Sequence, residues 1–405
     1  NPADKPGLAA FTAGMLQEGT STRSSQQLAD ELANLGASLG SGAGREDARI
    51  ELSSLKSSFA QGLTLLADVA LNPVFSPAEV ERQQAARLAA LAQAREQAPA
   101  VASVVGNRLV FGEEHPLGRN ALGDEATIKA IDSAALKAFW QSRYRPDQAA
   151  LVVAGDVGEA ELRRLAESLF GAWQRPATAP GAAARPITRS SAARLVLIDK
   201  PGAPQTALAV VAPGPLAAHP DSASINVMNA ALGGLFTSRI NHQLREVKGY
   251  TYGIYSGYSM GLESGQFGIR GSVRTEVTGA ALGDMFKEIE GMRAKPMGAE
   301  ELSRVRNAQL LSLPGLFDTN RVVVGSYASN WTWGLPANHI TQLPTKLAAV
   351  TAASAFKAAQ QHVDPAGLIV VAVGDKAKLL PQLEALGRKP MEQRDVNGAL
   401  LPQTP

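Results

Sequence analysis

The sequence contains no cysteine, which excludes disulfide bonds and thiolate metal sites and leaves the redox compartment undetermined. It has no apolar run of 18 residues, so no membrane-spanning helix is expected. It also lacks a strong charge bias, because a formal net charge of +2 over 405 residues is too small to indicate a nucleic-acid partner. With 45% hydrophobic and 19% charged residues, the composition is typical of a folded globular protein of two or more domains.

Recognisable catalytic motifs are also missing. None of the five histidines lies in an H-E-x-x-H or H-x-x-E-H frame, and their spacing gives no support to a metal site built from scattered residues. Two Gly-x-Ser-x-Gly strings occur, at 36–40 and 257–261. A nucleophile elbow needs a strand before the serine and a helix after it. The first string has the reverse order and the second lies between two strand-like runs, so both are interpreted as turns.

The stretch 174–193 is rich in Pro, Gly and Ala without apolar periodicity, which predicts a linker. Similar endings occur before it and near the C-terminus, at 146–156 and 365–375. In each, a proline opens an apolar run that ends in Gly-Asp and is predicted to be a buried strand, and a helical pattern follows. These endings favour a duplicated unit, although two unrelated strand–helix endings remain the alternative. We predict domains at 1–173 and 194–405.

The order of elements predicts an α+β fold, in which each domain has an antiparallel or mixed β-sheet with helices packed on one face. In the first domain we expect helices at 24–35 and 77–95, with Gly36 ending the first of them, and a strand at 48–52. In the second domain we expect helices at 222–246 and 298–313 and strands at 250–257 and 266–273.

The segment Gly-Leu-Ala-Ala-Phe-Thr-Ala-Gly-Met-Leu-Gln-Glu-Gly-Thr, at 7–20, resembles the catalytic helix of the pitrilysin-type zinc peptidases, the M16 family. Ala10 and Gly14 stand where that family has its two zinc histidines, and Ala13 stands where it has the general-base glutamate. The position of the third ligand, a glutamate, falls at Ala89 or Ala90. Catalytic zinc needs three protein ligands and a bound water, and none of these side chains has a lone pair to offer. The resemblance therefore implies a degenerate site without zinc.

A second string, Leu-Arg-Glu-Val-Lys-Gly-Tyr-Thr-Tyr at 244–252, is similar to a motif of the family's C-terminal domain. In the family, the arginine and the second tyrosine contact substrate, and here they are Arg245 and Tyr252. A guanidinium and a phenol both donate hydrogen bonds to a peptide carbonyl, and such bonds strengthen as an oxyanion develops. Spacing alone would equally allow Arg245 to be a surface residue and Tyr252 to share a strand face with Tyr250.

The resemblance implies a non-catalytic, substrate-binding subunit of a heteromeric zinc peptidase that degrades unfolded peptides in a clamshell chamber. This chain would hold no cofactor, and a catalytic partner bearing H-x-x-E-H would supply the zinc. We expect no nucleic-acid or membrane partner. The family also suggests a periplasmic location, and because the chain opens just before the first motif, we expect that an upstream segment precedes it.

Two other functions stay open. The chain could be a purely structural subunit, like the peptidase-derived core proteins of respiratory complexes. It could also be a stand-alone peptide-binding protein that pairs with itself as a homodimer. The intact Arg245 and Tyr252 argue against the first, and a stable homodimer that binds peptides without a partner would favour the second.

Overall fold

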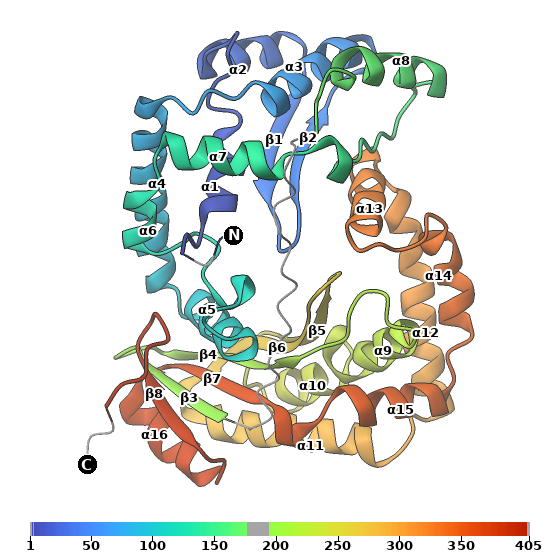
Figure 1. The fold of residues 1–405 in the computed structure, drawn as a ribbon. Helices are drawn as coiled ribbons and strands as arrows, with labels where there is room; N and C mark the ends of the chain where they lie inside the picture. Colours follow the sequence, from blue (N-terminus) through green and yellow to red (C-terminus); the bar gives the residue numbers. More distant parts are fainter. Residues whose placement is uncertain (1, 3, 176–193, 403–405) are drawn as a thin grey trace. The chain divides into compact units, whose positions relative to one another are not determined.

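The computed structural model describes residues 2, 4–175 and 194–402, which fall into two compact units (Figure 1). Unit 1 is drawn from 1–92, 120–184 and 316–332, and unit 2 from 93–119, 185–315 and 333–405. Residues 176–193 of the predicted linker lie outside the described residues. The units differ from the predicted domain bounds in two segments, since 93–119 groups with unit 2 and 316–332 with unit 1.

Unit 1 is mainly helical. Its helices are α1 (Leu8–Met15), α2 (Ser25–Asn34), α3 (Phe59–Leu71), α4 (Pro77–Glu96, which runs on into unit 2), α6 (Glu125–Ala130), α7 (Ser133–Arg143), α8 (Glu159–Phe170) and α13 (Asn320–Thr332). Strands β1 (Ser38–Ala43) and β2 (Ala48–Ser53) pair as an antiparallel hairpin. The predicted helix at 24–35 is confirmed in detail, because Ser24 and Gln27 form a reciprocal capping box and Gly36 has φ +58°.

The run at 151–156 was expected to be a buried strand, and this prediction was wrong. A short 3₁₀ turn, Pro146–Gln148, leads into it, and its residues are half-buried or exposed without strand structure. It pairs with neither β1 nor β2, and apolar residues alone do not make a strand without a neighbouring ladder of hydrogen bonds. Its counterpart at the C-terminus does have neighbours and forms strand β7 (Ile369–Gly374).

A buried carboxylate, Asp68 on α3, fixes the turn that follows α1. It accepts hydrogen bonds from the side chains of Thr20 (2.7 Å), Thr22 (2.9 Å), Arg23 (2.8 Å) and Asn72 (2.9 Å). Burial raises the pKa of Asp68, but the four donors together outweigh it and leave the pKa below its usual value near 3.8. The ionised carboxylate therefore stabilises the fold of unit 1.

We predict that Asp68→Asn lowers the free energy of unfolding at pH 7 by about 1.5–3 kcal/mol, since hydrogen bonds to a charged group are lost. Because the folded-state pKa is depressed, the contribution is present above about pH 4 and is lost as the pH falls below it. Denaturant titrations of both proteins at pH 7 and pH 3.5 check this. Exposed Asp30 provides the control, because Asp30→Asn should change stability by less than about 0.5 kcal/mol. Equal stability of wild type and Asp68→Asn at pH 7 would contradict the prediction.

Unit 2 is built on a six-stranded mixed sheet with the order β5-β6-β4-β7-β3-β8. Neighbours are antiparallel from β5 to β7 and parallel from β7 to β8. The strands not yet bounded are β3 (Arg194–Asp199), β4 (Gln205–Pro213), β5 (Ile254–Met260), β6 (Gly265–Arg274) and β8 (Met391–Arg394). The helices are α5 (Ala98–Phe111), α9 (Ser222–Asn229), α10 (Arg239–Asn241), α11 (Thr278–Ala294), α12 (Ala299–Ser312), α14 (His339–Ala348), α15 (Ala352–His362) and α16 (Lys376–Ala385).

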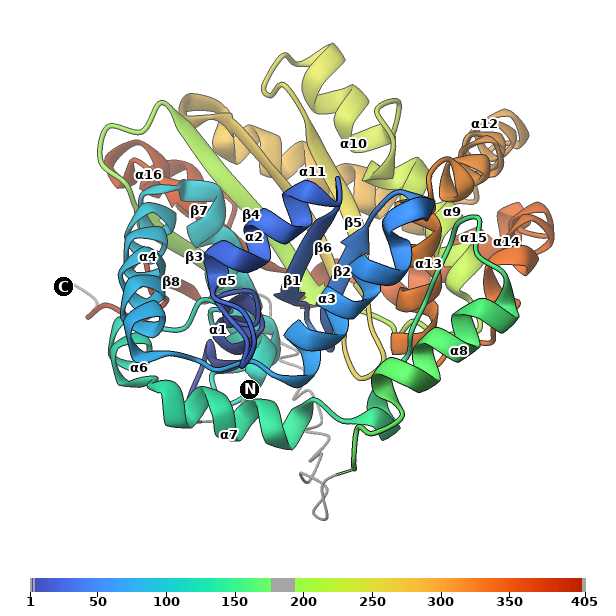
Figure 2. The same cartoon turned by 90° about the horizontal axis from the view of Figure 1, so that it is seen from above.

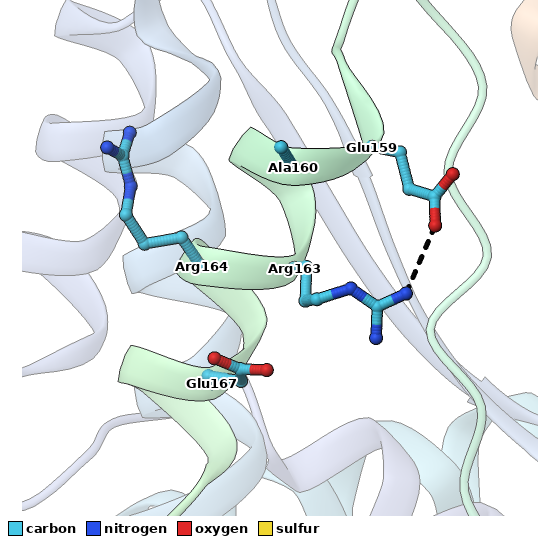
Figure 3. A pocket seen from close by; sticks show the side chains of 5 residues that line it. All are labelled: Glu159, Ala160, Arg163, Arg164 and Glu167. Atoms are coloured by element: carbon cyan, nitrogen blue, oxygen red, sulfur yellow. Dashed lines mark hydrogen bonds and ion pairs between the residues drawn. The ribbon is translucent and has the colours of Figure 1, made fainter.

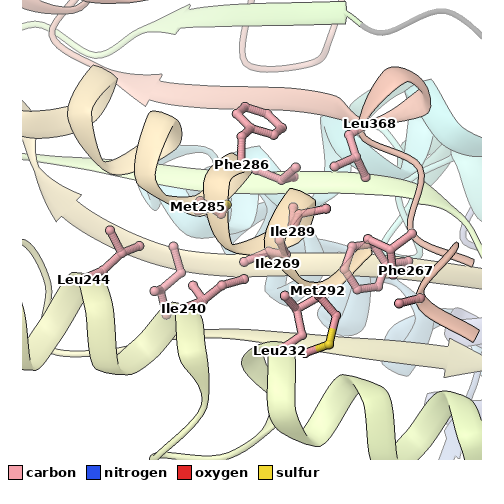
Figure 4. Close-up of a cluster of buried hydrophobic side chains, with 14 of the residues drawn as sticks. Leu232, Ile240, Leu244, Phe267, Ile269, Met285, Phe286, Ile289, Met292 and Leu368 are labelled. Carbon is pink, nitrogen blue, oxygen red and sulfur yellow. The ribbon is translucent and has the colours of Figure 1, made fainter. Parts of the chain in front are cut away.

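The central strands of this sheet are buried on both faces. Leu195 and Leu197 of β3 point into one apolar cluster, and Val196 and Ile198 point into another, as the alternation of a strand requires. Helices α9, α11, α15 and α16 cover the first face, and α5 covers the second (Figures 1 and 2). On the first face, Ile289 of α11 lies beside Ile269 of β6 (Figure 4). The α+β fold is confirmed, but the sheet of unit 2 has helices on both faces where one covered face was expected.

Two predicted elements of unit 2 differ from the structure. The helix expected at 222–246 is interrupted at Leu235–Ser238, and on either side its last turns widen into π-helix, at Ala230–Gly234 and His242–Val247. Gly233 lies in the first of these turns and passes close to strand β5, since a Cβ there would lie 2.5 Å from Ser256 Oγ. The strand expected from Tyr250 begins only at Ile254, so Tyr250 and Tyr252 lie in the preceding loop.

Candidate functional site

Helix α1 carries the positions where the resemblance places zinc ligands. Ala10, Ala13 and Gly14 are spaced i, i+3 and i+4, so they share one face of the helix. Ala13 is fully buried, whereas Ala10 and Gly14 are half-buried. The helix starts at Gly7, which has φ +87° and lies so close to the chain at Leu122 that a Cβ would come within 2.6 Å of that carbonyl oxygen. The close packing of Gly7 against Leu122 fixes the position of the helix face that carries Ala10, Ala13 and Gly14.

An arginine from α4 fills the space beside this face. Arg87 Nη2 donates to the carbonyl oxygen of Ala10 at 2.7 Å, and the guanidinium lies 4.5 Å from the centroid of the Phe11 ring. A Cβ at Gly14 would lie only 2.8 Å from the same Nη2 atom. The absence of a side chain at Gly14 therefore has two effects. It removes a zinc ligand, and it leaves space for the Arg87 guanidinium.

The guanidinium of Arg87 places a fixed positive charge where a metal cation would otherwise approach. Burial lowers the pKa of Arg87, although an arginine remains protonated in proteins and has no lone pair for a metal. In the described part of the chain no carboxylate pairs with it. The site can hold neither zinc nor the water that zinc activates.

Sequence comparison missed Arg87 and pointed to Ala89 and Ala90, both of which are exposed on α4. The face of α4 that packs inward runs through Val80, Gln84, Arg87 and Leu91, at helical spacing. The sequence did contain a signal for Arg87, since it lies on the same helix face as the buried Val80 and Leu91. That signal could be interpreted only once the position of α1 was known.

Arg245 lies at a helix end as expected, whereas Tyr252, which was expected in the next strand, lies in the loop before it. Arg245 lies in the π-helical turn His242–Val247, its guanidinium stacked 4.4 Å from the Phe236 ring centroid and 3.3 Å from a carboxylate oxygen of Glu246. Gly249 breaks the helix with φ +62°. The Tyr252 side chain is 88% exposed. Among the described residues no hydrogen bond or ring contact joins Arg245 to Tyr252, so any joint action requires a bound molecule between them.

Strand edges, another means of holding a peptide, are partly closed. At the free edge of β5, Asn241 Oδ1 accepts from Ile254 N (3.2 Å) and Asn229 Nδ2 donates to Ser256 O (3.2 Å). At β1, the Gln17 amide in its fully satisfied orientation donates to Leu39 O (2.7 Å) and accepts from Ser41 N (2.9 Å), as a peptide unit would. These side chains occupy part of the β5 and β1 edges, at Ile254, Ser256, Leu39 and Ser41.

A shallow hollow on α8 offers no comparable chemistry. Its lining residues all come from that one helix, namely Glu159, Ala160, Arg163, Arg164 and Glu167 (Figure 3). Glu159 and Arg163 form an exposed i, i+4 ion pair at 3.0 Å, worth a few tenths of a kcal/mol. The lining side chains carry charges of both signs, and no lining residue comes from another element. The hollow is therefore a solvated helix face. The described residues gather three potential metal ligands near α9, and not at α1.

Two family models match the chain and together cover well over half of it. Residues 1–119 match the insulinase (peptidase family M16) model, and residues 130–309 match the peptidase M16 inactive-domain model. A protein of Mycobacterium leprae described as an uncharacterized zinc protease is 26% identical over 302 residues, which are 71% of this chain and 67% of that protein. The match to a similar Mycobacterium bovis protein spans 60% of that protein.

Two further relatives illustrate the range of similarity. The β subunit of the mitochondrial-processing peptidase of Blastocladiella emersonii is 30% identical over 206 residues, half of this chain and 43% of that one. The solved structure of a peptidase M16 inactive domain from Pseudomonas fluorescens superposes with a TM-score of 0.82 at 24% identity. It covers 92% of this chain and 89% of its own. That likeness concerns the fold alone.

Proposed function

Since this chain belongs to the M16 peptidase family, we propose that it is the non-catalytic, substrate-binding subunit of a heteromeric zinc peptidase that degrades unfolded peptides. The observation that carries the proposal is a contrast between two sites. The α1 face has no zinc ligand and is filled by Arg87, whereas Arg245 and Tyr252 of the second motif, at 244–252, keep their hydrogen-bond donors. Relatives that are named as zinc proteases and as a peptidase subunit support the proposal that the chain works in a zinc peptidase.

In this proposal the partner carries the H-x-x-E-H motif, and its zinc supplies the activated water. This chain contributes hydrogen-bond donors to the peptide. Phe236 stacks on the Arg245 guanidinium, which has further N–H donors besides the Nε that lies 3.3 Å from Glu246. The exposed Tyr252 hydroxyl provides a second donor. Both donors would hold a peptide carbonyl and would bind more strongly as negative charge develops on its oxygen.

Gln17, Asn229 and Asn241 occupy parts of the edges of β1 and β5, so a peptide that adds to an exposed strand edge would pair with positions that these side chains leave free. Arg245 and Tyr252 would contact it through their side chains. The two chains would close as a clamshell around a chamber, so that the chamber's size and not a sequence motif selects the substrate. The proposed compartment is the bacterial periplasm, as the family resemblance implies.

The test is hydrolysis of a quenched fluorescent peptide with zinc, by this chain alone, by an H-x-x-E-H-bearing partner from the same source alone, and by the mixture. We expect no turnover by this chain and a mixed rate clearly above that of the partner. No gain on mixing would reject the accessory-subunit function. Zinc-dependent cleavage by this chain alone would show that the reading of α1 is wrong.

A further inference from the structure

Two histidines far apart in the sequence meet within unit 2. His219 lies just before α9 and His362 is the last residue of α15, and these two helices pack on the same face of the sheet. The imidazole centroids are 4.9 Å apart with the rings nearly perpendicular. Asp221, at the N-cap position of α9, completes the group, and one donor atom from each residue lies within 4.8 Å of the other two.

Surrounding contacts fix the backbones that carry these side chains. The Tyr258 hydroxyl donates to His362 O at 3.2 Å, and burial raises the pKa of Tyr258, which keeps that proton in place. Arg293 donates to Gln360 O (2.8 Å) and Val363 O (2.7 Å) on either side of His362. Ser224 Oγ on α9 donates to Ser354 Oγ on α15 at 3.1 Å. Tyr258 and Arg293 therefore hold the end of α15, and the Ser224–Ser354 bond joins the first turns of α9 and α15, before any ligand arrives.

The carboxylate of Asp221 does not make the hydrogen bond that is usual for an aspartate at an N-cap. An aspartate at an N-cap ordinarily accepts a hydrogen bond from the first turn, yet Asp221 makes no side-chain cap bond to α9. Asp124 and Asp132, at the N-caps of α6 and α7, do make that bond. Asp221 instead lies with the two imidazoles, half-buried like them.

We propose that His219, Asp221 and His362 bind one zinc ion. Two imidazoles and a carboxylate are ligands that zinc accepts, and three protein ligands leave a fourth position for water. Tetrahedral zinc places its donor atoms roughly 3.3 Å apart, so binding draws the three groups closer than the 4.8 Å limit that they meet now. Mg²⁺ and Ca²⁺ prefer oxygen ligands and are disfavoured here.

Binding has one identifiable cost. His219 Nδ1 now accepts from Asp221 N at 3.2 Å, and a neutral imidazole that gives one nitrogen to zinc must carry its proton on the other. Whichever nitrogen takes the ion, this contact is lost. A single neutral hydrogen bond is a small loss beside three metal–ligand bonds. The site would connect the start of α9 to the end of α15, and it is separate from the degenerate face of α1.

The experiment uses full-length protein without a histidine tag, stripped with chelator and titrated with Zn²⁺ by calorimetry. We expect one ion per chain and a raised Tm, and Co²⁺ in place of zinc should give the visible d–d absorption of a tetrahedral site. Ca²⁺ and Mg²⁺ should give none of these signals. The variants His219→Asn and His362→Gln should each weaken zinc binding at least 10-fold while their metal-free Tm stays close to wild type.

His115 supplies a matched control. It precedes a proline and accepts a hydrogen bond from a backbone N–H two residues later, at Leu117 (3.1 Å), as His219 does at Asp221. His115→Asn should leave zinc binding unchanged. Absence of stoichiometric zinc binding by the wild type would overturn the proposal, as would equal binding by the His219→Asn/His362→Gln double variant. If the His362 variant fails to fold, the His219→Asn and Asp221→Asn variants decide the outcome.

Discussion

In the two-chain peptidase proposed for this chain, Arg245→Ala is expected to lower peptide hydrolysis about 100-fold, or about 2.7 kcal/mol in the activation free energy. The physical reason is the loss of a charged donor to the scissile carbonyl, whose negative charge increases towards the transition state. The expected loss falls mainly on kcat, because a donor that strengthens with developing charge contributes less to binding the ground state. The measurement is steady-state hydrolysis of a quenched fluorescent peptide by the mixture, with complex formation checked by gel filtration.

Lys248→Ala is the matched control, since Lys248 is an exposed cation on the same turn that ends the π-helical segment. It should change the rate less than 3-fold, because it lacks the stacking contact that Phe236 gives to Arg245. Tyr252→Phe, which removes only the hydroxyl, should lower the rate in the same direction as Arg245→Ala. If Arg245→Ala forms the complex and cleaves at the wild-type rate, the chain is a structural subunit.

A second large effect is expected when the zinc ligands are rebuilt. The variant Ala10→His/Ala13→Glu/Gly14→His should bind no zinc at α1 and should unfold about 1–3 kcal/mol more easily than the wild type. A side chain at Gly14 meets Arg87 Nη2 at 2.8 Å, and the guanidinium repels the cation. Adding Arg87→Glu removes both obstacles and places a carboxylate on the inward face of α4. That four-residue variant should bind one zinc ion at α1, measured by calorimetry in the His219→Asn/His362→Gln background, where the site between α9 and α15 is absent.

Ala90→Glu in place of Arg87→Glu is the control, because the sequence alignment points to this position whereas the structure leaves it exposed. We expect no zinc binding at α1 in that variant, since Arg87 remains in place. Zinc binding by the three-residue variant with Arg87 intact would show that the guanidinium does not block the site.

The elements that sequence predicted well are those whose signals are local. Helix α2 was placed to within a residue because Ser24 and Gln27 form its capping box and Gly36 ends it. Strand β6 likewise began and ended within one residue of its predicted bounds. The prediction of a strand at 151–156 failed because its signal is not local. An apolar run forms a strand only if a neighbouring strand is present to pair with it.

Among the residues of the candidate site, too, those with local signals could be predicted and those that depend on long-range packing could not. The loss of ligands at Ala10, Ala13 and Gly14 could be deduced from the family resemblance, because it depends on residue types within one helix. The position of Arg87 could not, since its contact with Ala10 O joins two helices 77 residues apart in the chain. A metal site built from scattered histidines had no support in the sequence, because only the packing of α9 against α15 brings His219 and His362 together. The roles of Arg245 and Tyr252 stay a prediction.

The grouping of α5 with the sheet of unit 2 has a consequence for how the chain is made. Its residues leave the ribosome long before strands β3 and β7, against whose Val196, Ile198 and Val371 its own Val101 and Val105 pack. Until β7 is synthesised near the C-terminus, α5 has no completed apolar surface to cover. A fragment cut at the predicted boundary would keep α5 in one piece and leave one face of the sheet bare in the other. The two halves of this sequence are therefore not independent folding units.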